Sequence, residues 1–246
     1  MNAVIFVGPT LSRDDAGSIL EATYLPPAAQ GDVYRAARAK PVVIGLVDGL
    51  FERTRAVWHK EILWAMSHGV HVFGSASLGA LRAVELAAFG MEGVGAVYSA
   101  FAAGNLEDDD EVAVAHEPAE QGFRATSIAM VDIRATVAAA VQAGVLGPRT
   151  AAALESLAKQ TFYPHRVYPR IIRDGAGRGL PMAELAAFNS WLPTGAVSIK
   201  RKDAVTMLEL IRSRIESGLE PKAVAYTLET SGTWESFRME MEAAGV

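Results

Sequence analysis

Short apolar segments alternate with longer amphipathic stretches through the first half of the chain. Three of these segments, residues 3–7, 42–47 and 70–74, have the length of a strand and are apolar at almost every position. Continuous apolar runs of this kind are typical of parallel strands that are covered on both faces. Two weaker patterns predict a fourth strand at residues 94–98 and a fifth at residues 111–116.

The stretches between these strands have the pattern of helices. The predicted helices of this half are residues 14–24, 32–39, 55–68 and 78–89. Gly69 and Gly90 directly follow two of them, at the position where a left-handed residue commonly ends a helix. Strands that alternate with helices predict an α/β fold, here a mostly parallel sheet with flanking helices.

After about residue 130 the pattern becomes almost entirely helical. The predicted helices are residues 130–143, 148–159, 181–191, 203–217, 221–228 and 233–242. In the fourth of them, Ala204, Leu208 and Ile211 form an apolar stripe that needs a partner surface. We therefore expect two domains: an α/β core over residues 1–130, and a mainly helical region over residues 131–246 that packs on it.

Composition narrows the class of protein. Half of the 246 residues are hydrophobic, which excludes a disordered chain, and the absence of cysteine excludes disulfides, cysteine-ligated metals and a thiol nucleophile. The net charge of −5 argues against a nucleic-acid-binding protein and leaves only Lys200-Arg201-Lys202 as a basic patch. We find neither a signal peptide nor an apolar run of the roughly 20 residues that span a bilayer, and expect a soluble, cytoplasmic protein.

Ligands of parallel sheets bind at the carboxyl ends of the strands. The predicted strands place four loops at that edge: residues 8–12, 48–52, 75–79 and the loop after Tyr98. The first loop contains Gly8, Pro9 and Thr10, whose amides and hydroxyl are candidate donors to an oxyanion or a phosphate. Nucleotide binding has little support, because no glycine-rich phosphate loop follows the first strand.

The most informative loop leads from the third strand into a helix. Residues 75–79 read Ser-Ala-Ser-Leu-Gly, which approximates the G-x-S-x-G elbow of serine hydrolases, with Ser75 in the first glycine position and Gly79 in the last. A tight turn of this kind would present Ser77 as a nucleophile and let the amide of Leu78 stabilise an oxyanion. The alternative is that Ser77 is only the cap of the following helix.

A serine nucleophile needs a base, and one predicted helix offers two in consecutive positions. His59 would give a Ser-His pair and Lys60 a Ser-Lys pair, in which the lysine must be neutral to accept a proton. Consecutive helical residues point about 100° apart, so only one of the two would face the serine. The alternative for His59, Lys60 and Glu61 is a solvated helix face.

Two further clusters have a structural and a functional interpretation. The five acids of residues 107–111, followed by His116, could hold a hard metal ion, receive a basic partner or form a solvated loop. The aromatic and basic residues 162–170 could bind a partner or anchor a loop.

Four segments together resemble the TfuA-like family. They are Phe-Val-Gly-Pro-Thr at residues 6–10, Trp-His-Lys-Glu-Ile-Leu at 58–63, the stretch from Phe73 to Ala83, and Asp-Asp-Glu-Val-Ala at 109–113. The resemblance covers about the first 145 residues, and residues 58–86 are its most specific part. In the helical half, only Lys202-Asp203-Ala204 resembles an element of the family.

The resemblance implies a function in peptide backbone thioamidation. Members of the family act beside YcaO enzymes, which use ATP to activate a backbone amide so that sulfur can replace its oxygen. The TfuA-like protein is understood to hydrolyse the C-terminal thiocarboxylate of a ubiquitin-like sulfur carrier, to release sulfide to its partner, and to help YcaO engage the peptide. It needs no cofactor for this hydrolysis.

The family's Ser-Lys pair corresponds to Ser77 and Lys60 in this sequence, with Lys202 as the second candidate for the lysine and His59 in a supporting role. A chain without cysteine cannot relay a persulfide, so the sulfur must stay on its carrier until hydrolysis. Two other classes stay open: a non-catalytic adaptor that docks YcaO to its substrate, and a generic serine hydrolase.

Overall fold

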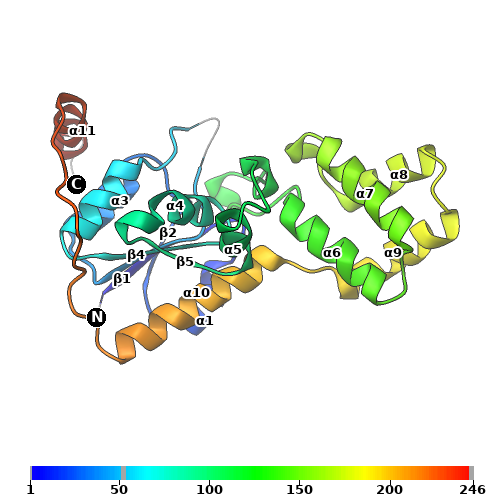
Figure 1. Ribbon diagram of the computed structural model, residues 1–246, viewed down its shortest axis with the longest axis horizontal. Coiled ribbons are helices and arrows are strands. Elements are labelled where there is room, and N and C mark those ends of the chain that lie inside the picture. Colours follow the sequence, from blue (N-terminus) through cyan, green and yellow to red (C-terminus); the bar gives the residue numbers. More distant parts are fainter. Residues whose placement is uncertain (1, 51–53, 244–246) are drawn as a thin grey trace. The chain divides into compact units, whose positions relative to one another are not determined.

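A computed structural model describes residues 2–50 and 54–243 of the protein (Figure 1). In these residues, five strands form one sheet that is parallel throughout, in the order β2-β1-β3-β4-β5. The strands are β1 (Ala3–Phe6), β2 (Thr23–Leu25), β3 (Val43–Leu46), β4 (His71–Ser75) and β5 (Glu92–Val94). The predicted α/β class, with its parallel sheet and a helical C-terminal region, is confirmed.

The helices follow the strands and then dominate the chain. They are α1 (Arg13–Ile19), α2 (Asp32–Arg38), α3 (His59–Ser67), α4 (Leu78–Leu86), α5 (Ala96–Ala102), α6 (Met130–Gln142), α7 (Pro148–Gln160), α8 (Tyr168–Gly177), α9 (Met182–Gly195), α10 (Ile199–Glu216) and α11 (Gly232–Ala243). Single 3-10 turns occur at Ala87–Phe89, Asp109–Glu111, Ala119–Gln121 and Tyr163–His165.

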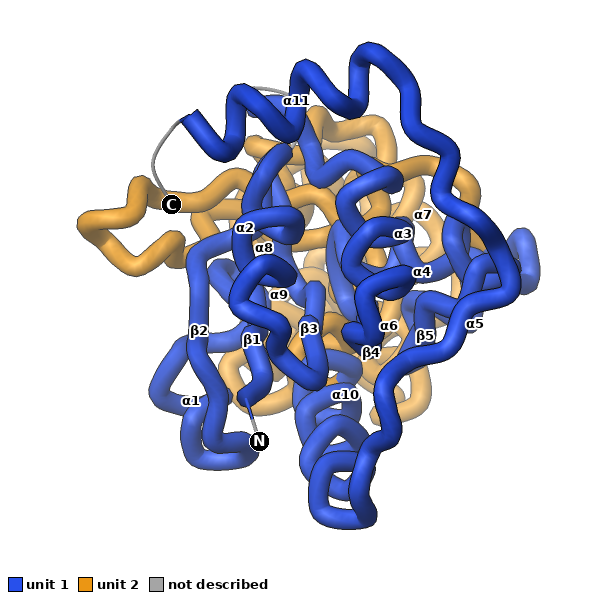
Figure 2. The backbone as a smooth tube through the Cα atoms, turned by 90° about the vertical axis from the view of Figure 1, so that its left-hand side faces the viewer, with its two compact units in different colours: residues 1–105, 203–246 blue, residues 106–202 orange. Residues whose placement is uncertain are grey.

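The chain folds into two compact units (Figure 2). Unit 1 comprises residues 1–105 and 203–246 and contains the sheet, whereas unit 2 comprises residues 106–202 and is helical. These boundaries differ from the division at residue 130 that the sequence suggested. The chain returns to unit 1 because the apolar stripe of α10, including Met207 and Ile211, is buried against the sheet.

Two apolar layers enclose the sheet of unit 1. Helices α2, α3 and α4 cover one face, where Ile62 and Met66 of α3 pack with Ile44 of β3. Helices α1 and α10 cover the other face, where Met207 packs with Phe73 (Figure 1). Burial on both faces explains why the strands read as continuous apolar runs.

Two predicted strands are wrong. The fourth strand ends at Val94, and α5 begins at Ala96 because the carboxylate of Asp203 accepts the backbone N–H groups of Ala96 (2.9 Å) and Val97 (2.7 Å). The segment 111–116 is not a strand. A 3-10 turn ends at Glu111, and His116 forms only an isolated bridge with Ala125.

The remaining differences concern short or irregular segments. Strand β2 escaped prediction because it is a three-residue edge strand directly before Pro26. Residues 221–228 are not helical; Lys222 donates its N–H to the carbonyl of Gly69, and the Tyr226 hydroxyl donates to the carbonyl of Leu63. Unit 2 contains α8, which was not predicted, beside α6, α7 and α9 around a core that includes Leu154 and Phe188.

Candidate functional site

The strand order locates the expected ligand-binding edge. From β1 the chain moves outward to β2, then returns past β1 to continue through β3, β4 and β5. The carboxyl ends of β1 and β3 therefore form the topological switch point, where doubly wound sheets of this order bind their ligands. The loops at residues 8–12 and 48–50 follow these two strands; residues 51–52 of the predicted second loop lie outside the described residues.

A buried carboxylate joins the two loops of the switch point. Asp48 follows β3 and is only 3% exposed. Its Oδ2 accepts the backbone N–H groups of Gly8 (2.9 Å) and Thr10 (3.0 Å), and its Oδ1 accepts the Thr10 hydroxyl (2.6 Å). The amides that the sequence suggested as oxyanion donors thus already have an acceptor. Sequence reasoning missed Asp48, although an acid directly after a buried apolar strand was a visible signal.

The turn after β4 has the tight geometry that the elbow pattern predicts. Ser75 ends the strand, Ala76 has a φ of +64°, and Ser77 donates its backbone N–H to the carbonyl of Ser75 at 2.7 Å. A three-residue turn with positive φ at a residue other than glycine is strained, by roughly 1–3 kcal/mol. Ser77 precedes α4 in the cap position and is 4% exposed, but its side chain does not make the capping bond.

Two glycines let the backbone of this turn approach its neighbours closely. A Cβ atom on Gly79 would lie 1.8 Å from the carbonyl oxygen of Leu46, and one on Gly74 would lie 2.1 Å from the carbonyl oxygen of Gly79. The N–H of Gly79 also donates to the carbonyl of Val47 at 3.3 Å. The first turn of α4 is therefore fixed against the end of β3, the strand that Asp48 follows.

The start of α4 is suited to negative charge. Amides of a first helical turn lack acceptors within the helix, and the helix dipole adds positive potential there. The amide of Leu78 belongs to this turn, and the side chain of Leu78 packs against Gly49. The fully buried hydroxyl of Ser75 has no hydrogen-bond partner among the described residues.

The two candidate bases of α3 point in different directions. His59 Nε2 lies 2.8 Å from Glu85 Oε2 of α4, the helix that follows Ser77. Lys60 Nζ donates to the Ser231 hydroxyl at 3.3 Å, at the start of α11, and lies 6.0 Å from the ring centre of Trp234. The contacts of Lys60 are thus with α11, whereas His59 is directed toward α4.

Glu61, the third residue of this block, is fully buried rather than solvated. Its carboxylate accepts the backbone N–H groups of Gly31 (2.9 Å), Tyr34 (3.2 Å) and Trp58 (3.1 Å). Burial raises the pKa of Glu61, and these hydrogen bonds oppose the rise. Glu61 therefore joins the starts of α2 and α3 and has a structural role.

Comparison with known proteins places the chain in a family. The model of the family described as TfuA-like protein matches residues 48–167. This range begins at Asp48, includes α3 and the turn at residues 75–79, and ends in unit 2. The chain belongs to the TfuA-like family. This family is associated with thioamidation and works with YcaO-type partners. No curated protein matches the chain.

The acidic run of this TfuA-like protein forms an ion-pair network within unit 2. Lys159 pairs with Asp108, Asp110 and Glu111, and the buried Arg166 pairs with Asp110. Burial raises the pKa of Asp110, but hydrogen bonds from Lys159 and Arg166 outweigh it and bring the pKa below its ordinary value. Among the described residues, no group of His, Cys, Asp or Glu could hold a metal ion.

Two other residues that the sequence singled out, Lys202 and Phe162, have exposed side chains. Lys202 is exposed on α10, next to the buried Asp203. Phe162 is 62% exposed, and its ring packs edge-on against that of Tyr163 in unit 2. In the part of the chain that the structure describes, no helix is both long and apolar enough to cross a membrane.

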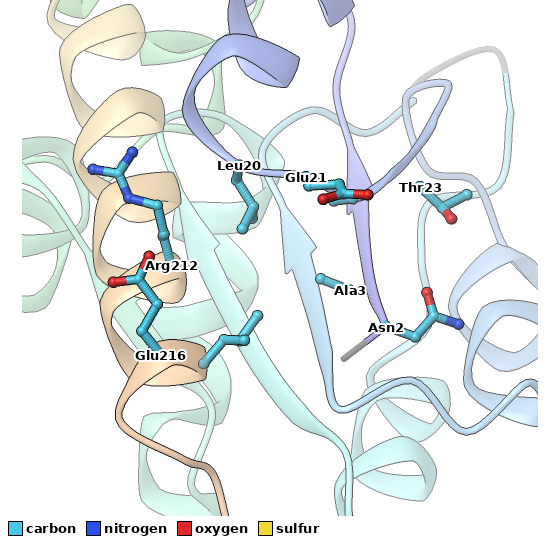
Figure 3. A pocket seen from close by; sticks show the side chains of 9 residues that line it. Asn2, Ala3, Leu20, Glu21, Thr23, Arg212 and Glu216 are labelled. Atoms are coloured by element: carbon cyan, nitrogen blue, oxygen red, sulfur yellow. The ribbon is translucent and has the colours of Figure 1, made fainter.

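Two cavities of unit 1 are lined by residues outside the loops 8–12, 48–50 and 75–79. One, of about 520 Å³, is lined by Asn2, Ala3 and Thr23 at the amino ends of β1 and β2, and by Leu20 and Arg212 (Figure 3). It lies at the edge of the sheet opposite the candidate site. The other, of about 280 Å³, is largely apolar, and its lining residues are Trp58, His59, Lys60, Leu63, Phe89, Tyr226, Thr227, Leu228 and Glu229.

Proposed function

We propose that this TfuA-like protein hydrolyses the C-terminal thiocarboxylate of a ubiquitin-like sulfur carrier, with Ser77 as the nucleophile, and supplies the sulfide to a YcaO-type partner. The observation that supports this most is the turn of Ser77. A buried serine is the last residue of a strained three-residue turn, stands directly before a nine-residue helix, and does not use its side chain as the helix cap.

The proposed reaction has two halves. The Ser77 oxygen attacks the thiocarboxylate carbon and loses its proton to a base; the carbon–sulfur bond then breaks, and sulfide leaves with its electron pair. Water attacks the resulting ester, which frees Ser77 and leaves a carboxylate on the carrier. The amide of Leu78 holds the oxyanion, because the amides of Gly8 and Thr10 already donate to Asp48 and the amide of Gly79 donates to the carbonyl of Val47.

Lys60 is the proposed base, as the resemblance to the family implies. To accept the proton, its amine must be neutral and must leave the Ser231 hydroxyl, to which it donates at 3.3 Å. His59 is the alternative base that the sequence offers; its ring contacts Glu85 in the last turn of α4, at the other end of that helix from Ser77. A Lys60→Met variant, compared with His59→Gln, separates the two assignments.

The function is tested by measuring sulfide release from a thiocarboxylated carrier protein. We expect turnover with the unmodified protein and a loss of at least about 10³-fold with Ser77→Ala, since a missing nucleophile removes the covalent path. Sulfide release at an unchanged rate would reject Ser77. If Ser77→Ala supports thioamidation by the partner without free sulfide, the protein acts as an adaptor instead.

A further inference from the structure

Gly8, Pro9 and Thr10, which begin the loop after β1, have no hydrogen-bond donor to spare. Three donors exist in Gly8, Pro9 and Thr10: the two N–H groups of Gly8 and Thr10 and the hydroxyl of Thr10, since proline has no N–H. All three donate to the carboxylate of Asp48, at 2.9, 3.0 and 2.6 Å. The three residues are partly exposed, so a bound molecule can reach them.

As a consequence, the polar atoms that Gly8, Pro9 and Thr10 still offer to a bound molecule are all hydrogen-bond acceptors. Because the Thr10 hydroxyl gives its proton to Asp48, its oxygen can only accept further hydrogen bonds. The backbone carbonyls of Gly8 and Pro9 are acceptors as well. The nearby charge of Asp48 strengthens the attraction for donors and repels anions. The sequence predicted donors for an oxyanion at this loop. The structure instead leaves acceptors, which suit the N–H groups of a bound molecule.

This acceptor surface and Ser77 lie on the same edge of the sheet, with one strand between them. The N–H groups of Val47 and Asp48 donate to the carbonyl of Phe6 at the end of β1, and Gly79 of α4 donates to the carbonyl of Val47. Neighbouring strands are about 4.8 Å apart, so two strand spacings are roughly 10 Å. An extended peptide rises about 3.3 Å per residue and covers this distance in about three residues.

We propose that the Gly8–Thr10 loop accepts hydrogen bonds from backbone N–H groups of the substrate, two or three residues before the acyl carbon that Ser77 attacks, and that Asp48 sets this preference. This inference rests on the proposed function and names what the same site recognises. The substrate is an extended peptide tail whose anionic end faces the Leu78 amide at the start of α4 and whose own amides face the acceptors of Gly8, Pro9 and Thr10. Acyl compounds without such amides lack this contact.

The substrate side of the test leaves the protein unchanged. A short synthetic peptide with a C-terminal thiocarboxylate is compared with versions in which one backbone N–H at a time is replaced by an ester oxygen. We expect kcat/KM to fall about fivefold or more, mainly through KM, when the change is two or three residues from the thiocarboxylate. Replacements five or more residues away serve as controls and should have no effect.

The protein side uses Asp48→Asn, which keeps the shape of the side chain. Its amide oxygen can accept both N–H groups, while its NH₂ donates to Thr10 and turns the hydroxyl into an outward donor. We expect this variant to lose most of the preference for N–H over ester at the sensitive position. Asp32→Asn is the matched control, because Asp32 also accepts a backbone N–H, from Ala29 at 2.7 Å, but belongs to α2.

Binding separates this inference from the proposed reaction. The same peptides ending in a carboxylate are titrated into Ser77→Ala, with tryptophan fluorescence as the readout. Weaker binding of the ester versions supports the acceptor surface even if no variant of the protein releases sulfide. The inference is overturned if the ester change has no effect at any position, if it costs as much in Asp48→Asn as in the unmodified protein, or if no peptide binds.

Discussion

Single residues decide which hydrogen-bonding groups the Gly8–Thr10 loop and the turn of Ser77 present to a substrate. The spacing of Ser75, Ser77 and Gly79 could be recognised in the sequence, because a tight turn between a strand and a helix needs small residues. The partners of Asp48 could not, since Gly8 and Thr10 are 40 and 38 positions away. The sequence shows which residues have hydrogen-bond donors, but not which of these donors already bind an acceptor in the folded protein.

The role of Lys60 can be tested at this scale. If Lys60 is the base, Lys60→Met should lower kcat for sulfide release by about 100-fold or more, because general bases contribute about 10²–10⁴-fold. Ser231→Ala, which removes the present hydrogen-bond partner of Lys60 and the acceptor of the Trp234 N–H at the start of α11, should leave kcat unchanged. Equal activity in Lys60→Met and the unmodified protein would transfer the assignment to His59.

The close approach at Gly79 makes a second prediction. A methyl group there must displace the backbone carbonyl of Leu46, so Gly79→Ala should lower the free energy of unfolding by about 3 kcal/mol in urea titrations. Gly17→Ala in α1 is the control, because its Cβ meets nothing within 4 Å and alanine favours a helix. In this control the free energy of unfolding should rise by about 0.4–1 kcal/mol. A neutral Gly79→Ala would contradict the packing described here.

At the scale of elements, periodicity predicts the buried strands and most helices well. It fails where a distant side chain decides the conformation. Residues 94–98 look like a strand, yet Asp203 binds the amides of Ala96 and Val97 and starts α5. The acidic run likewise reads as a solvated loop, and only the fold brings Lys159 and Arg166 to Asp110.

This ion-pair network predicts an acid-sensitive unit 2. The pKa of Glu111, like that of Asp110, lies below its ordinary value, because hydrogen bonds from Arg134 and Lys159 outweigh the effect of burial. The unfolded chain therefore binds more protons, and the stabilisation is present above about pH 4, the ordinary carboxyl pKa, and is lost as the pH falls through the lowered values. The loss of stability is measured as the difference between the melting temperatures at pH 7 and pH 3.5, followed by the helical circular dichroism signal.

Lys159→Met should reduce the difference in melting temperature between the two pH values. Arg124→Ala, which breaks the exposed pair of Arg124 with Glu117, is the matched control and should leave the difference as it is. A Lys159→Met protein with the full acid sensitivity would show that other groups cause it.

For the whole molecule, the sequence predicts the parallel sheet, the helical region and the family. It does not predict that the chain leaves unit 1 after residue 105 and returns to it at Asp203. That return depends on the burial of α10, whose apolar stripe fits a bundle and a sheet equally well on the sequence alone. The strand order, and with it the switch point between β1 and β3, also requires the structure.

The central claim is that Ser77 becomes acylated by the carrier. Rapid acid quenching of the protein with a thiocarboxylated carrier, followed by protease digestion and mass spectrometry, tests this most directly. We predict an ester between the carrier's C-terminal residue and Ser77, formed as sulfide appears and absent in Ser77→Ala. Sulfide release with the ester on another residue, such as Thr10 or Ser75, would contradict the account.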